Sequence, residues 1–184
     1  NNNAVIALQQ KILDRSNVGF IFVNRQVTND PEFLAEEETF NRVLGMDFNY
    51  LTSDNIWSGK AYVHKSFNPG DDGKSFSSGG FLEYNTRFWK FNLGSTYVGK
   101  DFQADLGFVR REDIFTVDPV ATRIFYPVNS SVNTHTLEVR SNLTWSPDLD
   151  FLLTDGMVDV EYQIQFTDQS SIEMALNHTY TYLL

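Results

Sequence analysis

The chain has 184 residues, 41% of them hydrophobic, and a formal charge of −10 at pH 7. No run of eighteen apolar residues occurs, which argues against a helical membrane protein. The acidic balance argues against a nucleic-acid partner, and the absence of cysteine excludes a disulfide scaffold and a thiolate metal site.

Apolar and polar residues alternate through most of the sequence, and this period of two predicts β-strands. The first hairpin is expected to pair Ala4–Leu13 with Val18–Gln26 across Asp14–Asn17, whose side chains suit a turn. A long polar connection follows. The second hairpin then pairs Phe40–Leu51 with Ile56–Phe67.

A third hairpin joins Ser77–Asn85 to Phe88–Val98, and the pattern is harder to follow beyond Gly99. We expect strands at Phe102–Val109 and Ala121–Tyr126, with an irregular segment, Ile114–Val120, that contains Pro119 between them. The remaining predicted strands are Thr134–Trp145, Met157–Phe166 and Ser171–Leu184. Periodicity thus predicts about eleven strands and no helix.

Short turns and long connections alternate along the first half of the chain. The connections after Gln26 and Phe67 are long and polar, whereas those around Asp14, Thr52 and Thr86 are short. Outer-membrane β-barrels show this asymmetry because their periplasmic turns are minimal and their external loops are not. The alternation predicts an antiparallel up-and-down transmembrane β-barrel. After Gly99 the alternation requires a long loop, but the predicted connection Gly99–Asp101 is short, so either the alternation breaks there or the predicted strand bounds are wrong.

The clearest strand pattern is Val158–Phe166, in which apolar residues alternate without exception with two carboxylates and two amides. Such a strand has lipid or core on one face and water on the other. In Phe40–Leu51 the pattern places Arg42 on the apolar face, near the strand end, where a bilayer tolerates arginine. The predicted lumen-facing residues are Glu138, Arg140, Asp159, Glu161 and Glu173. The predicted lipid-facing residues are Trp89, Phe91, Tyr97, Trp145, Tyr162, Phe166, Tyr180 and Tyr182.

Several short stretches resemble the barrel region of a Bacteroidota outer-membrane β-barrel family, domain-of-unknown-function family 5916. The matching stretches are Arg15-Ser16-Asn17-Val18-Gly19, Asn24-Arg25, Gly45-Met46-Asp47-Phe48, Ala104-Asp105-Leu106-Gly107-Phe108-Val109-Arg110-Arg111, Asn133-Thr134-His135-Thr136 and Trp145-Ser146-Pro147-Asp148. The resemblance implies an outer-membrane barrel that follows a carbohydrate-binding-like N-terminal domain. No segment of this chain matches that domain, and the resemblance supplies no catalytic motif.

The sequence contains no residue pattern typical of a metal site. His64, His135 and His178 lack the short spacing of metal ligands. The acidic Glu36–Glu38 run and the Asp71–Gly73 loop lack the ligand spacing of a calcium loop, and solvated loops are the better interpretation. We predict no metal and no cofactor.

A glycosidase needs two carboxylates at a set separation, and Asp159, Glu161, Glu173 and Glu138 could supply such a pair. Any acidic lumen offers such pairs by chance, so we predict no catalytic residue and no enzyme. The alternatives that stay open are a soluble carbohydrate-binding β-sandwich and a glycan-acting hydrolase.

The sequence therefore predicts an all-β barrel segment in the bacterial outer membrane, with a structural, transport or assembly-subunit role. Both ends of the sequence lie in predicted strands, so we expect residues 1–184 to be a segment of a longer chain. The expected partner is outer-membrane lipid. Other subunits of an outer-membrane complex and a glycan stay open as further partners, and nucleic acid is not expected.

Overall fold

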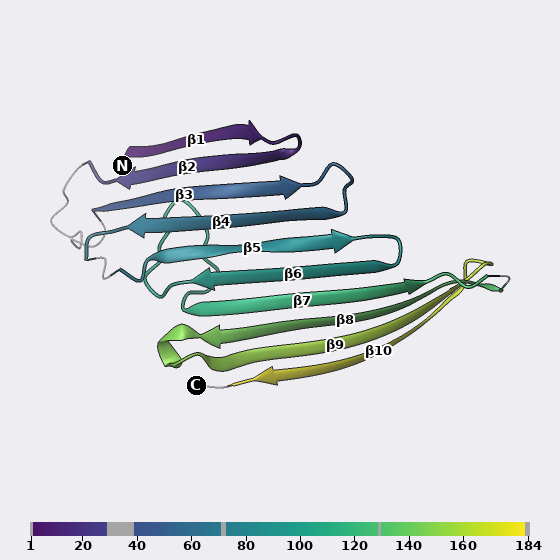
Figure 1. Cartoon of the computed structure of the whole chain (residues 1–184). Helices are drawn as coiled ribbons and strands as arrows, with labels where there is room; N and C mark the ends of the chain where they lie inside the picture. The colour runs from purple at the N-terminus through teal and green to yellow at the C-terminus, as the bar shows by residue number, and fades with distance from the viewer. Residues whose placement is uncertain (1, 29–38, 71–72, 129, 183–184) are drawn as a thin grey trace.

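The computed structural model describes residues 2–28, 39–70, 73–128 and 130–182. They form one antiparallel sheet in which every strand lies beside its neighbours in sequence (Figure 1). The strands are β1 (Asn2–Ile12), β2 (Ser16–Gln26), β3 (Phe40–Leu51), β4 (Trp57–Phe67), β5 (Phe76–Asn85), β6 (Trp89–Val98), β7 (Ile114–Phe125), β8 (Val132–Ser146), β9 (Leu152–Phe166) and β10 (Ser171–Thr181). The up-and-down all-β prediction is confirmed, with ten described strands instead of about eleven.

The predicted strand at Phe102–Val109 is wrong, because no strand forms there. Its apolar residues alternate as those of a strand do, but only some of them pack against the sheet, and Leu106 and Phe108 are exposed. Phe102 is 6% exposed, and Ala104 and Val109 pack beside it. Apolar alternation in an irregular segment therefore predicted an extra strand, and burial explains it at Phe102 and Ala104 only.

The predicted irregular segment before Ala121 is also wrong, because β7 begins at Ile114 and continues through Pro119. Pro119 is aligned with Leu93 of β6. On its other side, the pairing with β8 stops at Val117 and resumes at Val120. Proline has no N–H to donate to a ladder, so a local gap on one side accommodates it within a sheet.

Connection lengths differ between the two ends of the sheet (Figure 1). One end, which we call the turn end, carries the short connections 13–15, 52–56, 86–88, 126–131 and 167–170. The other, the loop end, carries 27–39, 68–75, 99–113 and 147–151. The predicted alternation thus continues past Gly99, because the third long connection extends to Asp113. It fails only at 147–151, which contains the short 3-10 helix η2 (Pro147–Leu149).

The sheet is open in the structure. β1 and β10 lie at opposite edges and do not pair with each other (Figure 1). Every residue of β1 and of β10 is exposed. The structure therefore shows an open up-and-down sheet and does not show a closed barrel.

One face of the sheet has no layer packed on it in the described part of the chain. Among these residues only Val43, Val98 and Phe102 are buried hydrophobic residues, whereas large apolar side chains such as Leu8 and Leu176 are 66% and 76% exposed. A soluble domain of this size normally buries most of its large apolar side chains. The described residues include no helix that could span a membrane.

Candidate functional site

Residues 99–113, between β6 and β7, fold back over one face of the sheet, and we call this segment the strap. Phe102 of the strap packs with Val43 of β3 and Val98 of β6. Side chains two residues apart on a strand share a face, and so do partners in adjacent strands. The face that contains Val43 and Val98 is the strap face. The opposite one is the aromatic face.

Asn41 holds the strap on the sheet. Its side chain is on the strap face of β3 and the residue is 2% exposed. Its Nδ2 donates to the carbonyl oxygen of Gln103 at 3.1 Å, and its Oδ1 accepts from the backbone N–H of Asp105 at 3.1 Å. The backbone N–H of Gln103 also donates to Ser66 Oγ at 3.1 Å. These bonds satisfy strap backbone groups that lie outside the sheet ladder.

Ion pairs tie the strap to distant strands. Arg25 of β2 and Asp105 form one with an Nη1–Oδ2 distance of 2.6 Å. Arg111 and Asp155 of β9 form another at 2.6 Å. The strap thus connects strands near both edges of the sheet.

A cavity of about 980 Å³ lies between the strap and the strap face. Its lining runs from Ile21 of β2 through His64 of β4 and Thr116 of β7 to Asp155 of β9. In a flat sheet β2 and β9 would be roughly 34 Å apart, at about 4.8 Å per strand interval. Because residues of both β2 and β9 line the same cavity, the two strands must be closer than in a flat sheet, and the sheet therefore curls around the strap.

The strap face is polar and acidic. Alternation and strand register place more carboxylates than cationic groups on it. The carboxylates on the described strands are Asp47, Glu83, Asp118, Glu138, Asp155, Asp159, Glu161 and Glu173, and the cationic side chains are Lys11, Arg25, Lys60, Lys90 and Arg140. A water-filled space beside this face would therefore attract cations.

All five predicted lumen-facing residues lie on the strap face, and four of them form one ion-pair network. Arg140 Nη2 lies 2.6 Å from Glu138 and 3.2 Å from Glu161, and its Nε lies 3.7 Å from Asp159. Glu173 lies on the same face of β10, opposite Gln163. One guanidinium shared by three carboxylates leaves a net negative charge there.

All eight predicted lipid-facing residues lie on the aromatic face. Trp89, Phe91 and Tyr180 are 42%, 43% and 42% exposed. The register aligns Trp89 with Tyr162 through β7 and β8, close to the turn end. Phe166 is also near the turn end, and Tyr97, Trp145, Tyr180 and Tyr182 lie toward the loop end.

Most aromatic residues on this face gather in two rows, one near each end of the strands, whereas Phe20 and Phe22 lie in the middle of β2. β4, with 11 residues, begins at Trp57 and ends at Phe67. β3 has Phe40 and Tyr50 near its ends, and β7 has Phe115 and Phe125. Small or aliphatic residues lie between the rows, among them Ala61, Val63, Leu93, Ser95, Val117, Ala121, Val139 and Val160. An 11-residue strand rises about 33 Å, which spans about 25 Å when tilted by roughly 40°.

Two arginines at the turn end were not singled out from the sequence. Arg123 on β7 lies over the rings of Trp89 and Phe125, at 4.7 and 4.9 Å from their centroids. Arg87 lies over the ring of Tyr126 at 4.6 Å. The alternation in β7 and the aromatic residues around both positions are the signal that could have indicated them.

The histidines are dispersed. His64 lies on the strap face against Tyr62, with ring centroids 5.0 Å apart. His135 contacts the Tyr162 hydroxyl at 2.7 Å, and His178 lies on β10. Within the described ranges, no group of three or more His, Asp or Glu side chains could hold a metal. Glu36–Glu38 and Asp71–Asp72, weighed above as calcium loops, lie outside the described residues.

Comparison with protein-family models, with curated proteins and with solved structures finds no match for this chain. The resemblance to the Bacteroidota outer-membrane family stays a prediction from the sequence.

Proposed function

We propose that this chain forms part of a β-barrel in the bacterial outer membrane, with the aromatic face toward lipid and the strap face toward a polar lumen. Its role in this proposal is transport: the strap narrows a water-filled passage with a preference for cations. The observation that carries the proposal is the pair of aromatic rows that border an aliphatic band. Outer-membrane barrels have such a band, about 25 Å tall, between two aromatic girdles.

The strap face supports the transport role. Its charged side chains need water, and a lumen supplies it where lipid cannot. The strap crosses this face at the loop end, and a segment folded there would reduce the cross-section of a passage. Asn41 and the ion pair between Arg25 and Asp105 hold it in place.

Closure of the sheet is part of the proposal. Unpaired backbone groups at the edges of β1 and β10 would each cost several kcal/mol in lipid. The two strands run in opposite directions, so they can pair with each other or with additional strands in the same up-and-down pattern. We expect either arrangement in the membrane.

The two alternatives have less support. A carbohydrate-binding sandwich needs a second layer on the apolar face, and the described residues provide none. A hydrolase needs a carboxylic acid and a carboxylate with separate environments, whereas Glu138, Asp159 and Glu161 share Arg140.

Heat-modifiable migration tests the proposal. The native full-length protein is extracted from membranes and run on a gel with and without boiling. We expect solubility only in detergent and a shift in migration on boiling. A protein that stays monodisperse in plain buffer without detergent would overturn the proposal and favour the soluble sandwich.

A further inference from the structure

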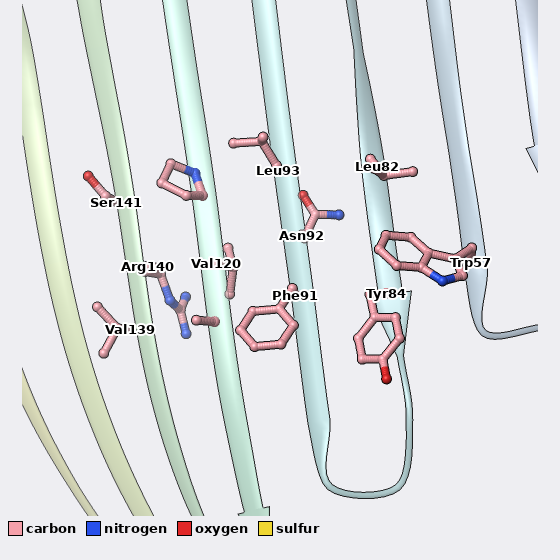
Figure 2. A pocket seen from close by; sticks show the side chains of 12 residues that line it. Trp57, Leu82, Tyr84, Phe91, Asn92, Leu93, Val120, Val139, Arg140 and Ser141 are labelled. Carbon is pink, nitrogen blue, oxygen red and sulfur yellow. The ribbon is translucent and has the colours of Figure 1, made fainter.

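An apolar groove of about 610 Å³ crosses the aromatic face from β4 to β8 (Figure 2). Trp57, Tyr84 and Phe91 border it near the hairpin that joins β5 and β6, and Leu93 lies farther from that hairpin (Figure 2). The smaller residues Pro119 and Ala121 of β7 leave it hollow. A groove with this lining accepts a hydrocarbon chain and offers almost nothing to a polar ligand.

Arg123 lies beside this groove on the turn side. The register aligns Phe91 with Ala121, which lines the groove, and the next outward pair on the same face is Trp89 with Arg123. The guanidinium packs on the rings of Trp89 and Phe125 and donates one bond, from Nη1 to the carbonyl oxygen of Phe88 at 3.3 Å. A guanidinium carries five N–H donors, so others are left for a ligand.

Arg87 and Arg123 share an aromatic partner, because both guanidiniums lie over the ring of Phe88, at 5.5 and 5.6 Å from its centroid. Within the described part of the chain, neither arginine forms an ion pair. In a chain of net charge −10 with 24 acidic residues, two adjacent arginines without a carboxylate are a local positive patch at the edge of an apolar band. Arginine forks bind phosphate oxygens in a bidentate manner.

We infer that Arg87, Arg123 and the groove form a binding site for an anionic phospholipid. The phosphate of the headgroup binds the two guanidiniums at the turn end, and an acyl chain enters the groove over Ala121. This inference rests on the proposed membrane location. It adds lipid selectivity, with a preference for phosphatidylglycerol over phosphatidylcholine with the same acyl chains.

Native mass spectrometry of the full-length protein with these two lipids tests the inference. Replacing both arginines, R87Q with R123Q, should lower phosphatidylglycerol retention by about tenfold for each arginine and leave phosphatidylcholine retention unchanged. Ala121→Phe fills the groove and should lower phosphatidylglycerol retention although both arginines remain. The matched control is Arg42→Gln, which removes an arginine of the same face whose Nε donates to Asn24 Oδ1 at 3.1 Å.

Equal phosphatidylglycerol retention in the wild type and the double variant would overturn the inference, and so would an equal loss in Arg42→Gln. Heat-modifiable migration is measured on each protein first. If the wild type shows it and lipid selectivity is absent, only the lipid site is wrong. If the wild type shows no such migration and needs no detergent, the proposed membrane location is wrong.

Discussion

Asn41 and Asp105 are joined across 64 residues of sequence by a hydrogen bond of 3.1 Å from the Asp105 backbone N–H to Asn41 Oδ1. The amide of Asn41 also binds the carbonyl oxygen of Gln103, so one buried side chain takes up both a donor and an acceptor of the strap. The position of the strap in the proposed lumen depends on this residue.

Asn41→Ala should release the strap. It leaves the Gln103 carbonyl and the Asp105 N–H without their partner, at a cost of about 1–3 kcal/mol for each buried group that stays unsatisfied. In planar bilayers we expect a larger single-channel conductance and more frequent current fluctuations than in the wild type.

Asn49→Ala is the matched control for this variant. Asn49 lies on the same face of β3, where it bonds to Asn17 and Asp47 and makes no bond to the strap. Conductance that is unchanged in Asn41→Ala, or raised equally in Asn49→Ala, would show that the strap does not narrow the passage.

Removing carboxylates near Arg140 should weaken cation preference. The double variant Asp159→Asn with Glu161→Gln removes two negative charges from the strap face and leaves the strap anchors in place. We expect the reversal potential in a salt gradient to move toward that of a nonselective pore. Glu112→Gln in the strap and Glu83→Gln near the turn end are the controls. If the Arg140 network sets the cation preference, the reversal potential should move less in these variants than in the double variant. Unchanged selectivity in the double variant would show that this network does not face the conducting water.

The loop end should respond to acid through Asp148. Hydrogen bonds from Lys100 and Lys74, at 2.8 and 2.7 Å, hold the pKa of this carboxyl below its usual value. A lowered pKa stabilises the folded form above the unfolded pKa of about 3.9, and the contribution is lost as pH falls through the lower folded value.

The readout for Asp148 is protease cleavage of the strap, measured from pH 5 down to pH 2 with an acid-active protease. Cleavage should rise over this range in the wild type and change less in Asp148→Asn, which has no charge to lose. A wild type and variant with the same pH profile would contradict this assignment.

Gly80 and Gly156 should differ in their tolerance of a methyl group. A Cβ at Gly80 would lie 1.9 Å from the backbone oxygen of Lys60, whereas one at Gly156 would meet its nearest atom, Leu143 Cδ2, at 3.5 Å. Gly80→Ala should therefore destabilise the sheet by about 1–3 kcal/mol. Gly156→Ala, on the same aromatic face, should have much less effect. Urea titration of the detergent-folded protein measures both, and equal midpoints would show that β4 and β5 are not packed as described.

Most of the sheet could be predicted from the sequence because strand periodicity is local. Val158–Phe166 alternates strictly and lies within β9. The strap could not be predicted in this way, since Phe102 and Ala104 alternate like strand residues but pack in a cluster with Val43 of β3 and Val98 of β6 instead of pairing in a strand. At Pro119 the error was the opposite one, because a strand was predicted to be interrupted where it continues. The missing N–H of proline suggested a break in the strand, but only the pairing with β8 is interrupted there.

The Arg140 network could be predicted in part from the sequence. Alternation placed Glu138, Arg140, Asp159 and Glu161 on one face, and the register between β8 and β9 brings them together. The groove beside Arg123 depends on the side-by-side position of five consecutive strands, β4 to β8, which local patterns do not encode.

Accessibility of spin labels along β9 tests the two-faced arrangement most directly. The chain has no cysteine, so single cysteines at positions 158 to 163 can be labelled without a background. In lipid bilayers, labels at Val158, Val160 and Tyr162 should collide mainly with oxygen, which concentrates in lipid. Labels at Asp159, Glu161 and Gln163 should collide mainly with a water-soluble nickel complex. Nickel access that is equal at all six positions, or an inverted pattern, would contradict a membrane barrel with its aromatic face toward lipid.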